Sequence, residues 1–146
     1  TILDGVITYT PTMDFFGDDT ITLSGTDELG GVTSTTITVT VANINDDSIF
    51  VVAENISLVE NTSIEIPFTV TDVDGSITGT TVSALNGSTT ILDGVITYTP
   101  TEDYEGSDTI TLEATDIDSN VTSTTIPVTV THFDNSAVIT VEANVS

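Results

Sequence analysis

The chain has 146 residues, of which 23 are aspartate or glutamate and none is lysine or arginine, so its formal net charge is −23. Nucleic acids and anionic membranes are bound through basic side chains, and this composition excludes both as partners. It also excludes disulfides and cysteine-based zinc sites, because there is no cysteine, and no apolar run approaches the ~20 residues of a membrane-spanning helix.

The chain begins with TILDGVITYTPT at Thr1–Thr12, and the same twelve residues return at Thr90–Thr101, a shift of 89 residues. The motifs DTITL and VTSTTI recur at the same shift. This period exceeds the ~20–50 residues of solenoid repeats and matches a small autonomous domain. We therefore expect the second half of one repeat at residues 1–44, a complete repeat at 45–133, and the first strand of a third at 134–146.

Alternating apolar and polar residues predict strands along the complete repeat. Ser63–Thr71, Asp108–Thr115 and Thr125–Val130 each place apolar side chains at every second position. Clusters of Gly, Asp and Asn separate these runs, and no helical period appears. Roughly seven short strands at turn spacings of ~8–12 residues predict an all-β fold of tandem antiparallel β-sandwich repeats. Pro67 and Pro127 fall on outward positions, which suits edge strands or bulges.

The acidic residues concentrate in the turns and at the junction between repeats, as in NINDDS at Asn43–Ser48 and TDVDG at Thr71–Gly75. Calcium takes ~6–8 oxygens from carboxylates, amide oxygens and backbone carbonyls, and short Asp and Asn side chains supply them. The same residues also cap turns without any metal, and acidity alone can serve solubility in a salty medium. A calcium site and plain turn capping therefore stand as alternative interpretations.

The order of these motifs resembles the cadherin-like and related Ig-like tandem repeats of giant bacterial surface adhesins, RTX-adhesin-like proteins often exported by type I secretion. The shared pattern is EN near the first strand, TDVDG after the second, GVITYTP with DTIT before the penultimate strand, and NIND at the linker. The resemblance covers the whole chain and implies Ig-like or cadherin-like sandwiches. It also implies Ca2+ at the junctions, held by ligands from both neighbouring repeats.

The resemblance implies a set of calcium ligands in the linkers, in the loops that face them and near the turn before the penultimate strand. The second linker places His132 and Phe133 in front of its acidic residue, so we expect the first junction to be the better site. The candidate ligands are Asn43, Asn45, Asp46 and Asp47 of the first linker; Glu60, Asp72, Asp74 and Asp116 of the complete repeat; Asp14, Asp18, Asp19, Asp103, Glu105 and Asp108 near the turns; and Asp134 and Asn135 of the second linker.

The leading functional hypothesis is a structural spacer or stalk in a long extracellular, bacterial cell-surface adhesin or filament. The alternative is a self-assembling filament or sheath subunit, whose N-terminal half-repeat is completed by strands of another copy. Partners are then neighbouring repeats or other copies of the chain, with any cell-surface or glycan target left to other domains. Without tryptophan, a carbohydrate-binding module is a minor alternative. No nucleophile, base and acid form a set, so we expect no enzyme.

Overall fold

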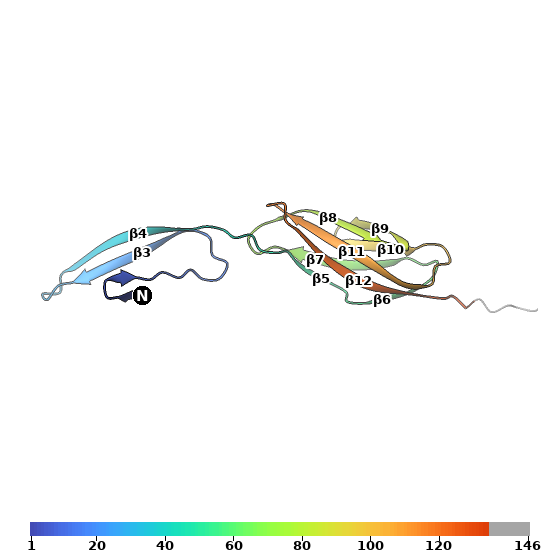
Figure 1. Ribbon diagram of the computed structural model, residues 1–146, viewed down its shortest axis with the longest axis horizontal. Helices are drawn as coiled ribbons and strands as arrows, with labels where there is room; N and C mark the ends of the chain where they lie inside the picture. The colour runs from blue at the N-terminus through green and yellow to red at the C-terminus, as the bar shows by residue number, and fades with distance from the viewer. Residues whose placement is uncertain (135–146) are drawn as a thin grey trace, which may run out of the picture.

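The computed structural model describes residues 1–134 and consists of twelve strands, with no helix in that range. Figure 1 shows two strand-rich bodies that follow one another along the long axis and are joined by an extended linker. No helix in the described part of the chain is long and apolar enough to cross a membrane.

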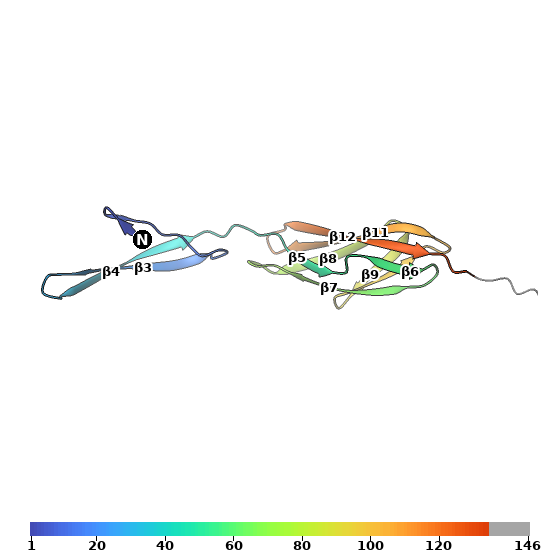
Figure 2. The ribbon, with the colours of Figure 1, turned by 90° about the horizontal axis from the view of Figure 1, so that it is seen from below.

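The complete repeat is a sandwich of two four-stranded sheets, with the strand orders β5-β7-β10-β9 and β6-β12-β11-β8. Figure 2 shows the layers from a second side. All strand pairs in these sheets are antiparallel except β6 with β12, which is parallel. The all-β sandwich prediction is therefore confirmed. The strands are β5 (Ile49–Val52), β6 (Ile56–Val59), β7 (Ile64–Thr71), β8 (Ile77–Ala84), β9 (Gly87–Leu92), β10 (Val95–Pro100), β11 (Gly106–Asp116) and β12 (Val121–Thr131).

Eight strands form where roughly seven are expected from the turn spacing, because the first strand is divided between the sheets. β5 pairs with β7 in one sheet, the chain crosses over at residues 53–55, and β6 then pairs with β12 in the other. The division ties the two sheets together through one short segment of backbone.

The first 44 residues form two short hairpins rather than a sandwich. β1 (Ile2–Leu3) pairs with β2 (Val6–Ile7), and β3 (Gly17–Thr26) pairs with β4 (Val32–Val41) over ten residue pairs. These strands correspond in sequence to β9–β12 of the complete repeat. The first strand of a third repeat, expected at 134–146, lies outside the described residues apart from Asp134.

The edge-strand positions expected for Pro67 and Pro127 are wrong, because β7 and β12 are inner strands of their sheets. Each proline stands one residue before the stretch that pairs with the divided first strand. β5 pairs with β7 only from Phe68 onward, and β6 pairs with β12 only from Val128 onward. Beside each proline, the inner strand therefore has a neighbouring strand on one side only. The missing N–H of the proline faces the unpaired side, so no hydrogen bond between strands is lost.

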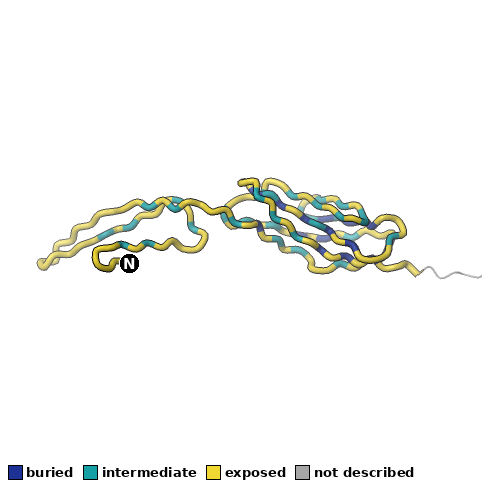
Figure 3. The backbone as a smooth tube through the Cα atoms, in the orientation of Figure 1, coloured by how far each residue is buried: buried dark blue, intermediate teal, exposed yellow. Residues whose placement is uncertain are grey.

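The core of the complete repeat is made by the apolar residues that alternate along its strands. Ile126 is fully buried in β12, whereas Ile37, at the matching position of β4, is 42% exposed. Figure 3 shows that the buried positions lie in the complete repeat, while residues 1–44 are exposed or half-buried. The buried cluster contains Leu58, Ile66, Phe68, Ile96, Tyr98, Ile110, Leu112, Ile126, Val128 and Val130.

Candidate functional site

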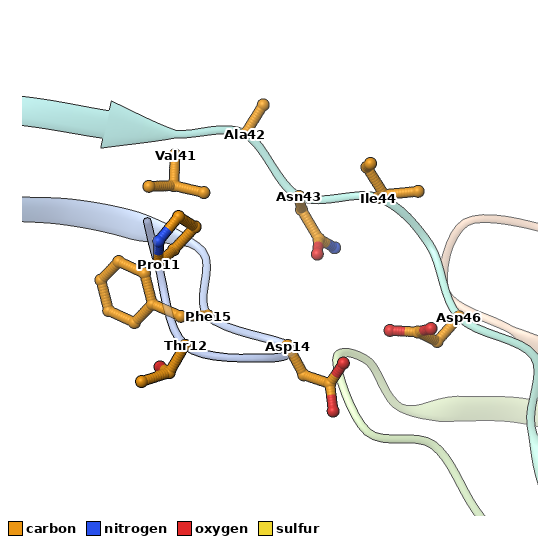
Figure 4. Close-up of a pocket in the computed structure, with 9 residues that line it drawn as sticks. All are labelled: Pro11, Thr12, Asp14, Phe15, Val41, Ala42, Asn43, Ile44 and Asp46. Atoms are coloured by element: carbon orange, nitrogen blue, oxygen red, sulfur yellow. The ribbon is translucent and has the colours of Figure 1, made fainter. Parts of the chain in front are cut away.

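The first junction is a pocket of about 360 Å³ between the end of the first half-repeat and the linker. Figure 4 shows that Asp14, from the turn before β3, and Asp46, from the linker, lie on the same side of this pocket as Asn43. Pro11, Phe15 and Val41 supply its apolar wall.

The amides of the linker bind carboxylates in two loops of the complete repeat. Nδ2 of Asn43 donates to Oδ2 of Asp74, in the loop between β7 and β8, at 2.8 Å. Nδ2 of Asn45 donates to Oδ2 of Asp116, at the end of β11, also at 2.8 Å. The linker is thus attached to the end of the sandwich that it enters.

Two further contacts complete this end of the sandwich. Asp72 accepts a hydrogen bond from Oγ of the buried Ser48 at 3.0 Å. Asn120 donates its backbone N–H to Asp116 and its side-chain amide to Asp47, both at 2.9 Å. Asn120 is not among the predicted ligands, and its position four residues after Asp116 is the one local signal that could have identified it.

The carboxylates at this junction lie close enough to affect one another. Partial burial, followed by the negative charges of Asp14, Asp74, Asp72 and Asp47, raises the pKa of Asp46. The hydrogen bond from Asn43 to Asp74 outweighs desolvation and holds the pKa of Asp74 below its usual value. Negative charge therefore accumulates at a point where the chain has no basic side chain to neutralise it.

The donor set at this junction suits a hard cation, although the carboxylates are not arranged around a common centre. Within residues 1–134, no three His, Asp or Glu side chains converge closely enough to hold a metal ion. Amide nitrogens of Asn43, Asn45 and Asn120 lie against the carboxylates instead. Because an asparagine amide carries its oxygen opposite its nitrogen, a half-turn of Asn43 or Asn45 would present an additional oxygen ligand.

A second cluster lies at the opposite end of the sandwich. Glu60 is 7% exposed, and its Oε1 lies 2.6 Å from Nδ1 of His132 and accepts the backbone N–H of Phe133 at 2.9 Å. Oε2 of Glu105 lies 3.7 Å from the same histidine nitrogen. Asp103 and Asn61 exchange two hydrogen bonds of 3.0 Å.

This second cluster surrounds a pocket of about 410 Å³. It brings together the predicted residues Glu60, Asp103 and Glu105. His132 is predicted only as a residue of the second linker, and Asn61 is not among the predicted ligands. Asp134 is exposed, and Asn135 lies outside the described residues.

The remaining candidates form hydrogen bonds inside their own repeats. Asp18 accepts from Oγ1 of Thr40 at 2.7 Å, and Asp19 accepts from the hydroxyl of Tyr9 at 2.8 Å. Asp108 is 6% exposed and accepts from the hydroxyl of Tyr98 at 2.8 Å. These carboxylates hold strands and turns in place, and none of these bonds reaches the junction.

The chain is similar to solved β-sandwich modules. Fibronectin(III)-like modules of Clostridium thermocellum CbhA align at 16% identity and a TM-score of 0.45, over 87% of this chain and 69% of theirs. A mutant of the SrpA adhesin of Streptococcus sanguinis aligns at 14% and 0.45, over 60% of each chain. Cadherin domains of protocadherin gamma B7 align at 20% and 0.48, over 82% of this chain and 33% of theirs. The chain thus spans less than two thirds of the length of the SrpA chain and of the protocadherin chain.

The sequence comparison identifies the family. No curated protein matches the chain. Residues 45–131, which include all eight strands of the sandwich, match the bacterial Ig domain. The chain therefore belongs to the bacterial Ig domain family.

Proposed function

We propose that the chain is a spacer segment of a long, repetitive bacterial surface protein, such as a giant adhesin, and that calcium stiffens the junctions between its repeats. The observation that carries the proposal is the composition of the first junction. Asp14 comes from one repeat, Asp46 from the linker, and Asp72, Asp74 and Asp116 from the next repeat. A cation bound among them would connect all three segments.

The repetition of the sequence supports a spacer. A stalk needs length and stiffness, and both come from copies of one sandwich joined end to end. The two copies of TILDGVITYTPT are identical, which suits a mechanical role better than a set of distinct binding sites. Membership of the bacterial Ig domain family fits this role. The role also implies an extracellular location.

Calcium would be held by the side-chain oxygens of Asp46, Asp72, Asp74 and Asp116, with Asp14 and the amide oxygens of Asn43 and Asn45 as further ligands. Such a set approaches the ~6–8 oxygens that calcium requires. Partial burial and, after it, the neighbouring carboxylates raise the pKa of Asp46, and the bound ion would neutralise those carboxylates. Without the ion, their mutual repulsion favours a flexible linker.

Small-angle scattering of the chain during calcium titration tests the proposal. We expect calcium to narrow the distribution of distances between the two repeats, relative to chelator in NaCl of equal ionic strength. Asp72→Asn combined with Asp74→Asn should raise the calcium concentration at the midpoint by at least about tenfold, because two charged ligands are lost.

The matched control is Asp93→Asn, which removes one charge in the β9–β10 turn. Asp93 has a φ of 50°, and asparagine tolerates this left-handed conformation. This variant should titrate like the original chain. Scattering that stays the same with calcium and with chelator would overturn the calcium part of the proposal.

A second candidate function is a filament subunit completed by strands from another copy, and it is favoured by the exposure of Ile37. Hydrogen exchange across a concentration series tests it. Completion by another copy would protect the amides of both β3 and β4 as the concentration rises, whereas a constant exchange rate would exclude it.

A further inference from the structure

Within residues 1–134, the outer edge of β4 is unpaired along its whole length. β4 pairs residue by residue with β3, from Val32 with Thr26 to Val41 with Gly17. Within residues 1–134 this sheet contains only β3 and β4, so no strand of that range lies on the other side of β4. In Figure 1 it forms the outer margin of the first body. Its backbone donors and acceptors on that side are available for strand pairing.

The C-terminal part of the equivalent edge of β12, from Pro127 to Thr131, is blocked in two ways. β6 covers it from Val128 to Thr131, and Pro127 stands immediately before the covered part. The carbonyl of Thr131 accepts the N–H of Glu60, at the end of β6. Backbone directions alternate along a strand, so Pro127, four residues earlier, faces the same side and removes an edge N–H.

β4 lacks this block. Both strands begin with VTSTTI, but the next residue is Thr38 in β4 and Pro127 in β12. By the same alternation, Val32, Ser34, Thr36 and Thr38 face the open edge of β4. A strand placed like β6 would begin beside Val39 and would leave residues 32–38 uncovered, so the open segment does not depend on whether the first repeat is completed.

The chemistry of this edge favours another uncharged strand as its partner. Val32–Val41 contains no charged residue, in a chain whose net charge is −23. Natural edge strands are usually protected by charge, proline or a bulge, and this segment has no charged residue or proline. Threonine, valine and isoleucine are strong strand formers. A basic partner would be drawn to the acidic turns, whereas a neutral strand fits the edge itself.

We propose that β4 is a dimerisation edge, which pairs antiparallel with β4 of a second copy of this chain. With Thr35 opposite Thr35 across a two-fold axis, Val32 pairs with Thr38 and Ser34 with Thr36. These four edge-facing residues of each copy are then hydrogen-bonded. The two hairpins become one four-stranded sheet in the order β3-β4-β4-β3, an isologous interface that closes on itself. This lateral association is independent of calcium and goes beyond the spacer role.

Cysteine cross-linking tests the interface, because the chain has no cysteine of its own. Thr35→Cys places the only thiols opposite each other in a non-hydrogen-bonded pair, where Cα atoms lie ~4.5 Å apart, within the range of a disulfide. Oxidation should give a covalent dimer. The control is Thr124→Cys, the matching position of β12, which should stay mainly monomeric under the same conditions.

A proline variant shows whether the β4 edge itself makes the contact. Thr38→Pro should raise the dimer dissociation constant at least about tenfold. The substitution removes one N–H···O bond donated by each copy, so the symmetric dimer loses two. β12 carries proline at this position and remains a strand, so the variant should still fold, as circular dichroism would verify. Sedimentation in about 0.5 M NaCl, which screens the negative charge, measures the constant.

A monomer at every concentration would overturn the proposal. It would also be overturned if Thr35→Cys cross-linked no better than Thr124→Cys, or if Thr38→Pro dimerised as well as the original chain. Either of these last results would point to contact through the exposed apolar face around Ile37 instead.

Discussion

Tyr98 and Asp108 connect the two sheets of the sandwich through a buried hydrogen bond. The hydroxyl of Tyr98, on β10, donates to Asp108, on β11. The backbone N–H groups of Asn86 and Thr109 bind the same carboxylate at 3.1 and 2.8 Å. Although burial alone would raise the pKa of Asp108, these bonds outweigh it and lower the pKa below its usual value. Burial, together with the hydrogen bond to Asp108, raises the pKa of Tyr98.

Asp108→Asn should cost about 1–3 kcal/mol at pH 7, because a charge-assisted hydrogen-bond acceptor is lost in a buried site. A lowered folded-state pKa contributes stability above the unfolded value of ~3.9 and loses it as the pH falls through the folded value. Urea denaturation at pH 7 and pH 3 should therefore show a smaller pH effect in the variant than in the original chain. The same pH effect in both would mean that the carboxylate does not stabilise the fold.

At the scale of elements, β4 and β12 show how neighbours decide what a strand contributes. Both contain VTSTTI, and both pair along their length with the preceding strand. β12 also packs within a complete sandwich, whereas β4 belongs to a two-stranded sheet. Identical local sequence therefore gives a fully buried isoleucine in β12 and a 42% exposed one in β4.

Ile126→Ala should destabilise the complete repeat by about 2–5 kcal/mol, because it leaves a cavity in a packed core. Ile37→Ala, the matched control, should cost well under half as much, since Ile37 is already 42% exposed. Denaturant unfolding of both variants measures the difference. Equal costs would show that the first half-repeat is covered in solution.

At the scale of the whole molecule, a net charge of −23 without any basic side chain makes cations the natural means of neutralisation. The junction charges come from three separate parts of the chain, so a bound cation acts on their relative positions as well as on local stability. Monovalent salt would screen this repulsion without connecting the repeats.

Calcium at 10 mM should stabilise the chain by about 1.4 to 2.7 kcal/mol, if the site binds at the ~10⁻⁴–10⁻³ M typical of extracellular modules. Thermal unfolding in calcium and in NaCl of equal ionic strength measures this difference. It should fall by at least about 1 kcal/mol when Asp72 and Asp74 are both replaced by asparagine, because calcium binding is then at least about tenfold weaker, and it should persist in Asp93→Asn. Stabilisation of equal size in NaCl would assign the effect to screening alone.

The sequence was a reliable guide wherever the physical cause is local. An alternation of apolar and polar residues is a property of the strand itself, and it predicted β7, β11 and β12 and their buried residues. The internal repeat predicted which strands of the first half correspond to those of the second. The acidic loops near Asp72 and Asp116 were also identified as neighbours of the linker, through a resemblance of motif order.

Sequence by itself therefore determined the strand period, the repeat and the charge that any function must accommodate. Only the tertiary structure decided how the first strand divides between the sheets, why proline is tolerated on inner strands, and which carboxylates meet. The reason is that Asn120 meets Asp47 across 73 positions of sequence, and His132 meets Glu60 across 72. Such contacts depend on sheet order and register, which the packing of the whole sandwich sets.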